Sequence, residues 1–376
     1  MALKPVYASS DFHGPAASSS SNEVELGRQI SFMPSKFMVV GHRGHGMNQM
    51  QTTDRRMSEF KENTILSFNS AAKHQLDFIE FDVQVSKDDC PVIFHDDFIL
   101  SQVNGTVFEK RVSDLTLEEF LSYGPQRGPA RSSGKPLLRK TMDGNIVAWF
   151  VEQDDHQCTL KEAFKRVDPS LGFNIELKFD DHIVYSEDYL ARFLKSVLKV
   201  VFKYANGRPI IFSTFQPDAA LLVRMMQTSY PVFFLTNGGT EIFYDTRRNS
   251  LEEAAKLCLE GGLQGIVSEV KAIFMNPTAI AMIKESKLSL LTYGKLNNVA
   301  GAVYMQYLMG IEGVIVDHVQ EITEAVSDLI GSQKAAEKGS TVATRAVEEA
   351  KKKPKISERE ISFLLKLISK LIIQLQ

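Results

Sequence analysis

The sequence has few cysteines and no long apolar run, and each of these scarcities excludes a class of protein. Cys90, Cys158 and Cys258 are an odd, widely spaced set among 376 residues, without the density of a disulfide scaffold or the Cys-x-x-Cys spacing of a metal clip. We interpret them as reduced thiols. No stretch reaches the roughly 20 apolar residues that span a bilayer, and the N-terminus lacks the apolar segment of a secretory signal. We therefore expect a protein that is neither secreted nor membrane-spanning.

An excess of charge of either sign is also absent. The chain carries 43 Lys and Arg against 46 Asp and Glu, a formal net charge of -3. Nucleic-acid binders usually recruit phosphates with a basic field, so we expect no nucleic-acid partner. The hydrophobic content of 44% is enough for one large core, such as a barrel of about 250 residues with additions.

The N-terminal segment, residues 1–35, is predicted to be flexible. Residues 1–22 are rich in Ser and Ala, with Asp11 as the single acid, which is typical of an organelle transit peptide. Lys4 as the single base argues the other way, because transit peptides are usually rich in arginine. We expect a cytoplasmic protein, with the plastid as the alternative.

Short apolar runs predict nine strands. They cover residues 37–41, 78–85, 91–95, 172–178, 209–215, 231–236, 263–269, 288–294 and 312–317. Only residues 86–90 separate the second run from the third, too few for a parallel crossover, so the third run must return antiparallel. Helical patterns lie at 186–204, 217–227, 250–260, 277–286 and 296–309. Eight parallel strands alternating with helices predict an α/β fold, a (β/α)8 TIM barrel over residues 36–331, with its active face at the carboxyl ends of the strands.

Three segments do not fit this repeat. Residues 97–158 are rich in turn residues and are predicted to be an insertion after the second barrel strand, over the active-site mouth, where it would select substrate. Residues 332–355 resemble a linker. Residues 356–376 carry an apolar stripe at helical spacing and predict a C-terminal amphipathic helix. That helix could dock on the protein itself or on a sister subunit, or lie on a membrane surface.

Two carboxylates at a strand end indicate a metal site. Glu80 and Asp82 are two residues apart, so on a strand both side chains point to one face, where an uncompensated buried pair is costly. A divalent cation would compensate it, and Glu176 from the next parallel strand can complete the ligand set. Oxygen ligands suit Mg²⁺, which we favour, or Ca²⁺.

Two histidines and two cations beside these acids predict phosphodiester cleavage. The reaction needs an activated nucleophile, a proton for the leaving alkoxide and stabilisation of charge on phosphorus. His42 and His95 follow apolar runs and could supply the first two. Arg43 has the planar donor fork that matches phosphate, and Lys178 can add a second contact.

These residues form an ordered set of motifs that resembles the glycerophosphodiester phosphodiesterase family, above all its soluble plant members. The motifs are His42-Arg43-Gly44, Glu62-Asn63-Thr64, Glu80-Phe81-Asp82-Val83, Pro91-Val92-Ile93-Phe94-His95-Asp96 and Ile175-Glu176-Leu177-Lys178. The resemblance covers residues 36–330. It departs from the family at Lys61, where many members have proline, and at Thr292-Tyr293-Gly294, which replaces a tryptophan-containing motif of the substrate wall.

The resemblance implies a phospholipase C-like barrel that hydrolyses glycerophosphodiesters, such as glycerophosphocholine and glycerophosphoethanolamine, to sn-glycerol 3-phosphate and an alcohol. This reaction belongs to phospholipid metabolism and phosphate recycling. It also implies roles for nine residues. These are His42 and His95 as the acid/base pair, Arg43 and Lys178 as phosphate contacts, Glu80, Asp82 and Glu176 as metal ligands, and Glu62 and Asn63 near or behind the metal.

Several alternatives stay open from the sequence. Either water attacks phosphorus, or the glycerol 2-hydroxyl attacks first and a cyclic phosphate is then opened, with the same residues involved. Related barrels that act on lysophospholipids or sphingomyelin share the core motifs, which makes a membrane-active diesterase the second enzyme hypothesis. A non-catalytic lipid-binding module anchored by residues 356–376, and a sugar-phosphate isomerase or aldolase, are further hypotheses that the paired acids and histidines disfavour.

Overall fold

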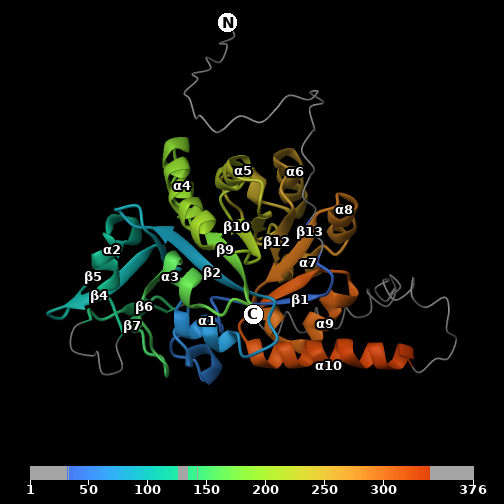
Figure 1. The fold of residues 1–376 in the computed structure, drawn as a ribbon, viewed down its shortest axis with the longest axis horizontal. Coiled ribbons are helices and arrows are strands. Elements are labelled where there is room, and N and C mark those ends of the chain that lie inside the picture. The colour runs from blue at the N-terminus through green and yellow to red at the C-terminus, as the bar shows by residue number, and fades with distance from the viewer. Residues whose placement is uncertain (1–31, 33, 126–133, 142, 339–376) are drawn as a thin grey trace, which may run out of the picture.

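Eight parallel strands close into a barrel, as predicted. The computed structural model describes residues 32, 34–125, 134–141 and 143–338. The barrel strands are β1 (Met38–Gly41), β2 (Phe78–Val85), β9 (Gly172–Leu177), β10 (Ile210–Thr214), β11 (Val232–Thr236), β12 (Gly265–Glu269), β13 (Ser289–Tyr293) and β14 (Gly313–Val316). Each strand pairs with the next in this order, and β1 pairs with both β14 and β2, which closes the circle (Figure 1).

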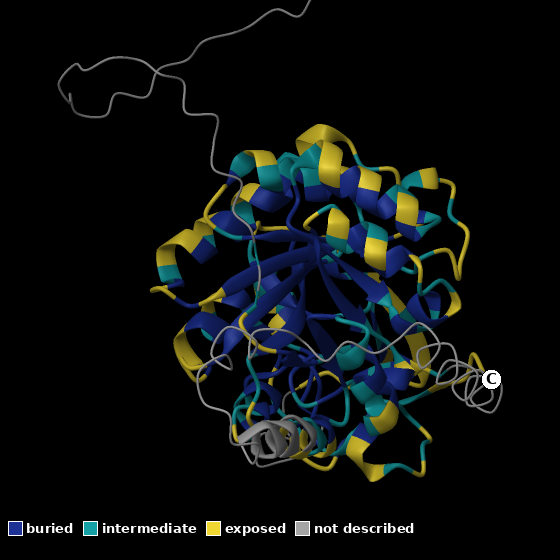
Figure 2. Ribbon diagram, turned by 90° about the vertical axis from the view of Figure 1, so that its right-hand side faces the viewer, coloured by how far each residue is buried: buried dark blue, intermediate teal, exposed yellow. Residues whose placement is uncertain are grey.

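Helices surround the barrel and show exposed outer faces, while the strands at the centre are buried (Figure 2). They are α1 (Ile65–Ala71), α3 (Leu160–Arg166), α4 (Glu187–Tyr204), α5 (Pro217–Met226), α6 (Leu251–Gly261), α7 (Val270–Met275), α8 (Ala279–Glu285), α9 (Ala300–Leu308) and α10 (Val319–Lys338). Local capping explains where several begin. The side chain of Ser186 accepts a hydrogen bond at the start of α4, and Pro217 occupies the first turn of α5, positions these residues prefer.

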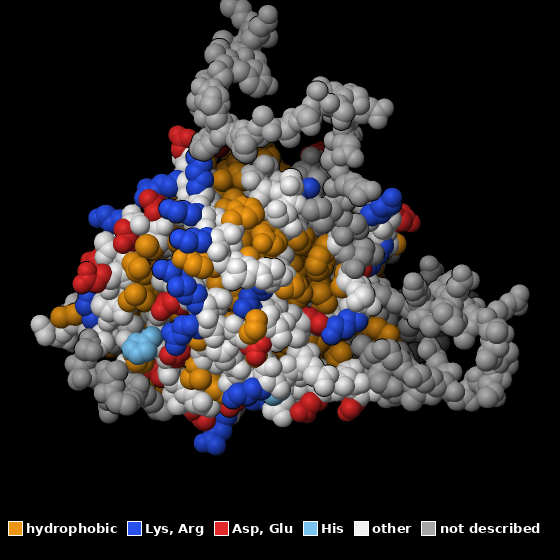
Figure 3. Space-filling model, viewed as in Figure 1, with side chains coloured by type: hydrophobic (Ala, Val, Ile, Leu, Met, Phe, Trp, Pro, Cys, Tyr) orange, Lys and Arg blue, Asp and Glu red, His pale blue; other side chains and the backbone are white. Residues whose placement is uncertain are grey.

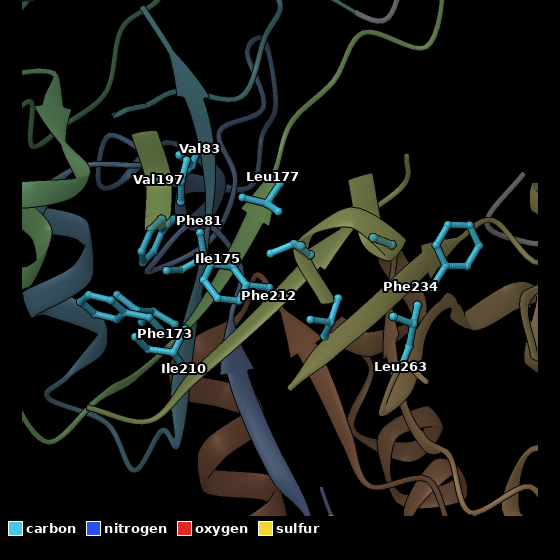
Figure 4. Packing of buried hydrophobic residues seen from close by; sticks show 14 of the residues in the cluster. Phe81, Val83, Phe173, Ile175, Leu177, Val197, Ile210, Phe212, Phe234 and Leu263 are labelled. Carbon is cyan, nitrogen blue, oxygen red and sulfur yellow. The ribbon is translucent and has the colours of Figure 1, made fainter. Parts of the chain in front are cut away.

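The alternation of side chains along each strand separates the helix-facing core from the barrel interior. Ile79, Phe81 and Val83 of β2 pack in the core between strands and helices, together with aromatic residues of neighbouring strands such as Phe173 (Figure 4). The intervening residues therefore face the interior. Phe78 packs there with apolar side chains from other strands. The next two interior positions of β2 are acidic, so the same strand gives an apolar floor and a polar mouth.

The insertion forms a small folded unit of its own. As predicted, β3 (Pro91–Ile93) runs antiparallel to β2, and it also pairs with β8 (Cys158–Thr159). Between them β4 (Phe98–Val103), β5 (Thr106–Arg111), β6 (Leu138–Lys140) and β7 (Ile146–Ala148) build a four-stranded antiparallel sheet, beside the short helix α2 (Leu117–Leu121). A separate apolar cluster that includes Phe94, Phe120 and Trp149 supports it. The insertion is therefore more regular than its turn-rich sequence indicated.

The C-terminal part differs from the prediction at one boundary. Helix α10 continues to Lys338, past residue 331, where we expected a linker to begin. Residues 333–338 are Gln, Lys, Ala, Ala, Glu and Lys, which are all strong helix formers. The remainder of the expected linker, the expected helix 356–376 and nearly all of residues 1–35 lie outside the described residues. Among the described helices, none has the length and apolar character needed to cross a membrane.

Candidate active site

Three carboxylates meet at the carboxyl ends of β2 and β9. Glu80 and Asp82 point into the barrel mouth, and the register pairs Asp82 with Glu176 on the adjacent strand. One ligand oxygen from each of the three lies within 4.8 Å of the others. Glu80 and Asp82 are 2% and 1% exposed, and Oε1 of Glu80 has no hydrogen-bond partner among the described residues. The three predicted metal ligands are therefore together, with one buried oxygen left unpaired.

Burial and mutual repulsion disfavour the ionisation of all three carboxylates in this cluster at once. Burial and the neighbouring Asp82 carboxylate raise the pKa of Glu80 to about 8. Burial also acts to raise the pKa of Asp82, but the ring of His95 and the cation Arg43 lower it to about 2. The pKa of Glu176 is raised, mainly by burial. A cation at this point would remove the penalty that keeps Glu80 protonated near neutral pH.

Arg43 and Lys178 place two positive charges beside the carboxylates. Nε of Arg43 lies 3.5 Å from Asp82, and its backbone N–H donates to Glu80 at 2.9 Å. Nζ of Lys178 lies 2.8 Å from Oε1 of Glu176 and 3.6 Å from Asp82. Gly44 follows with φ of +93°, and a Cβ there would lie 2.5 Å from Ser67 Oγ, so only glycine permits the turn that sends Arg43 inward.

The two predicted acid/base histidines have opposite electrostatic environments. Nδ1 of His42 lies 2.7 Å from Oδ1 of the partly buried Asp317. Burial acts to lower the pKa of His42, but the charge and the hydrogen bond of Asp317, with the nearby Glu80, together raise it above its ordinary value. The pKa of His95 is lowered well below its ordinary value by burial and by the cations Arg43 and Lys178. Such opposed environments suit a proton donor and a proton acceptor in one site.

Glu62 and Asn63 hydrogen-bond to the charged side chains of the site and fix their positions. Asn63 donates to Oδ2 of Asp82 at 2.8 Å. Glu62 accepts from Nη1 of Arg43 at 2.8 Å and lies 2.9 Å from Nη1 of Arg139 on β6. Burial acts to raise the pKa of Glu62, but these two guanidinium groups lower it to about 2. Asn63 therefore contacts a predicted ligand directly, whereas Glu62 contacts the predicted phosphate-binding Arg43 and links the barrel to the insertion.

Sequence reasoning missed Asp317 and Arg139. Asp317 directly follows β14, so the end of the last predicted strand was a signal for it, since barrel active sites collect residues from such ends. Arg139 carried no comparable signal, because its contact with Glu62 spans 77 positions and lies inside the insertion. Trp149 is a packing residue, 3% exposed and with its ring centroid 4.3 Å from the Arg139 guanidinium.

The two departures from the family pattern are accommodated locally. Lys61 is buried, with Nζ 3.8 Å from Asp154 and 5.2 Å from the ring centroid of Trp149. Tyr293 packs behind the cavity wall, with its hydroxyl hydrogen-bonded to Asn237 and its ring edge-on to Phe215, and both of these partners line the cavity. Lys61 therefore contributes to the contact between barrel and insertion, and Tyr293 supports two residues of the cavity wall.

A cavity of about 400 Å³ opens beside these groups. It is lined by His95, Glu176 and Lys178 on the inner side and by Phe179, Phe215 and Arg248 further out. The cavity therefore gives a small molecule direct access to one predicted acid/base residue, one predicted metal ligand and one phosphate contact. On the molecular face shown in Figure 3, charges of both signs are interspersed with apolar side chains.

Comparison with known protein families identifies the chain. Residues 42–321 match the glycerophosphoryl diester phosphodiesterase family. The chain belongs to this family. It is therefore a phosphoric diester hydrolase by membership, and the family confirms the resemblance that its motifs indicated.

Individual relatives agree with this assignment. The glycerophosphodiester phosphodiesterase GDPD1, chloroplastic, of Arabidopsis thaliana is 63% identical over 339 residues, 90% of this chain and 91% of the relative. The glycerophosphocholine phosphodiesterase gde1 of Schizosaccharomyces pombe is 34% identical over 77% of this chain, which corresponds to 28% of that longer protein. The solved structure of an Oleispira antarctica phosphodiesterase in complex with the product sn-glycerol-3-phosphate has a TM-score of 0.54 at 18% identity, covering 77% of this chain and 96% of that one. That structural similarity supports the barrel fold.

Proposed function

We propose that this glycerophosphodiester phosphodiesterase is metal-dependent and releases sn-glycerol 3-phosphate from glycerophosphodiesters with small head groups, including glycerophosphocholine and glycerophosphoethanolamine. The observation that carries the proposal is the cluster of three carboxylates beside two cations and two histidines at the barrel mouth. Relatives named for glycerophosphocholine support the choline ester as a substrate.

A divalent cation fits the carboxylate cluster. Glu80, Asp82 and Glu176 would hold it through oxygen atoms, the donors that Mg²⁺ and Ca²⁺ prefer, and we favour Mg²⁺. The unpaired Oε1 of Glu80 and the raised pKa of that carboxyl support the fit, because both are penalties that a cation relieves. When bound, the ion would polarise a phosphoryl oxygen and add positive charge to the site.

The chain's own side chains would handle phosphate and protons. Arg43 and Lys178 would bind the phosphoryl oxygens, and part of that attraction would strengthen as charge develops in the transition state. His42, with its raised pKa, would give a proton to the departing oxygen. His95, with its lowered pKa, would take a proton from the attacking hydroxyl. Asp317 would orient His42 by fixing which ring nitrogen carries hydrogen toward it.

The N-terminal segment bears on the cellular location of the protein. We propose a chloroplast location, since the relative named chloroplastic is 63% identical and residues 1–22 are rich in serine. A fluorescent fusion to residues 1–35 that stays in the cytoplasm would favour the cytoplasmic hypothesis instead.

We further propose that residues 356–376 attach the protein to a membrane or to a second copy of the chain. Deletion of residues 339–376 should then preserve hydrolysis of soluble diesters while weakening that attachment.

The activity is tested by measuring release of sn-glycerol 3-phosphate from glycerophosphocholine with Mg²⁺ present. The wild-type protein should release it, while Glu80→Gln and His42→Ala should both lose nearly all turnover. His156→Ala is the matched control, because that histidine is exposed and does not line the active-site cavity. Equal turnover by the Glu80→Gln protein would contradict the metal assignment.

A further inference from the structure

The active-site cavity continues into a second, outer chamber of about 550 Å³. The two share five lining residues, Phe179, Asp180, Asp181, His182 and Arg248. The outer chamber lies between the β9–α4 loop, residues 178–186, and the β11–α6 loop, residues 237–250. Both loops follow the carboxyl ends of barrel strands, so the chamber extends the active-site cavity outward from the strand ends.

Paired charges line this outer chamber. Asp181 lies 2.7 Å from Nη1 of Arg248. Arg247 contacts Asp218 at 2.7 Å and Asp245 at 2.6 Å. The remaining acid on the chamber wall, Asp180, lies 2.7 Å from Arg111. Every carboxylate of the chamber wall therefore has a guanidinium partner, and the wall presents alternating acceptors and donors instead of one uncompensated charge.

Arg248 lies at the junction between the inner cavity and the outer chamber and lines both. It is 7% exposed, its guanidinium lies 3.7 Å from the ring centroid of Phe243, and its Nε has no hydrogen-bond partner among the described residues. A buried, unpaired N–H costs free energy that a ligand acceptor would recover. Tyr244 in the same loop is fully exposed and lines the outer chamber, so it offers a ring face at the entrance.

We propose that the outer chamber binds the alcohol part of the diester and favours polyhydroxy head groups, such as inositol or glycerol, over cationic ones. The inference rests on the proposed hydrolase function and specifies its substrate class. Each hydroxyl both donates and accepts, so it can bridge a carboxylate and a guanidinium that are already paired. Aromatic rings such as Phe243 and Tyr244 cover the apolar faces of such alcohols.

A cationic head group fits this wall less well. A quaternary ammonium group makes no hydrogen bonds and is held by aromatic faces together with free negative charge. Two arginines, Arg247 and Arg248, already neutralise the acids beside those rings. Asp97 in the inner cavity lies apart from the outer chamber wall, and it is the acid that a cationic head group would use instead. The two possibilities therefore depend on different residues.

The test compares kcat/KM for glycerophosphoinositol and glycerophosphocholine with the full chain. The wild-type protein should prefer glycerophosphoinositol, and Arg247→Gln should lower the inositol-to-choline ratio about tenfold, as expected for loss of one hydrogen bond to a charged group. Asp218→Asn should lower the ratio in the same direction. Arg192→Gln is the control, because Arg192 makes a comparable exposed pair with Asp89 away from the chamber, and its ratio should equal the wild-type value.

Three other results would overturn the inference. Preference of the wild-type protein for the choline ester, with Asp97→Asn abolishing that preference, would assign head-group recognition to the inner cavity. An unchanged ratio in both Arg247→Gln and Asp218→Asn would show that the outer chamber does not contact substrate. Hydrolysis of neither ester with Mg²⁺ present would contradict the proposed function itself, and the head-group inference would fail with it.

Discussion

The barrel and the insertion contribute to the active site in different ways. The barrel supplies predicted groups from the ends of β1, β2 and β9 and the unpredicted Asp317 from the end of β14, and sheet register brings these strand ends together. The insertion supplies Arg139 from its own small sheet, supported by its own apolar cluster. Arg139 pairs with Glu62, which also holds Arg43, and it lies 3.6 Å from Asp96 on the cavity wall. The barrel therefore carries the groups expected to act on substrate, and the insertion stabilises Glu62, which supports them.

This difference predicts that substitutions in the barrel will mainly affect turnover, and substitutions in the insertion will mainly affect stability. A group on a barrel strand that contacts substrate should affect turnover with little effect on stability. A buried ionic group in the insertion should affect the free energy of unfolding first, because removing one partner of a buried pair leaves a charge without compensation. Four substitutions or measurements test the contrast.

The largest expected effect is on the barrel side. His95→Ala should reduce kcat by about 10²- to 10⁴-fold, the usual contribution of a positioned acid or base, with a nearly unchanged midpoint of urea unfolding. Steady-state kinetics and urea titration of the same preparation measure both. His156→Ala should match the wild-type protein in each. A His95→Ala protein that is fully active would remove this residue from the chemistry.

The corresponding effect in the insertion is on stability. Arg139→Gln should lower the free energy of unfolding by about 3 kcal/mol, since it breaks a buried ion pair with a side chain that is 10% exposed. Trp149 is the only tryptophan of the chain and contacts Arg139, so its fluorescence reports the change directly. The neighbouring, exposed Lys140→Gln is the control. Equal stability of the Arg139→Gln and Lys140→Gln proteins would show that the insertion does not support Glu62.

Asp317 sharpens the comparison, because it lies at the end of a barrel strand and acts on the chemistry through its hydrogen bond to His42, while Met47 and Asn298 hold it in place. Asp317→Asn should lower kcat by about 10- to 100-fold, as for groups that orient metal-ligating histidines. Asp317 raises the pKa of His42, so its removal should lower that pKa. If protonated His42 is the proton donor, the alkaline limb of the kcat profile should move to lower pH. A smaller kcat with an unshifted pH profile would indicate a purely structural role.

The smallest expected effect is the pH dependence of metal affinity. Glu80 has a pKa raised to about 8 and must lose its proton to bind an ion, so the proton and the ion compete. Below pH 8 the apparent Mg²⁺ affinity should therefore fall by up to about tenfold for each pH unit, and it should level off above. Calorimetric titration between pH 6 and 9 measures it. An affinity that stays constant over this range would exclude Glu80 as a ligand.

Most of the barrel could be predicted because its signals are local. Each barrel strand is a short apolar run, and two-residue spacing was enough to place Glu80 and Asp82 on one face. The boundary at α10 was missed because its last turns are polar but strongly helix-forming. Arg139 could not be predicted, since its position depends on strand pairing within the insertion. The paired arginines of the outer chamber, Arg247 and Arg248, lie in one short 3-10 turn of the β11–α6 loop, where no periodic pattern exists to place them.

The most direct test of the central claim is metal restoration of activity. Protein treated with EDTA and freed of chelator should release no sn-glycerol 3-phosphate from a glycerophosphodiester, and added Mg²⁺ should restore release with a saturable dependence on its concentration. Glu80→Gln protein should not respond to the ion. Full turnover by the wild-type protein in the continued presence of EDTA would contradict the account, because the clustered carboxylates would then serve the reaction without a cation.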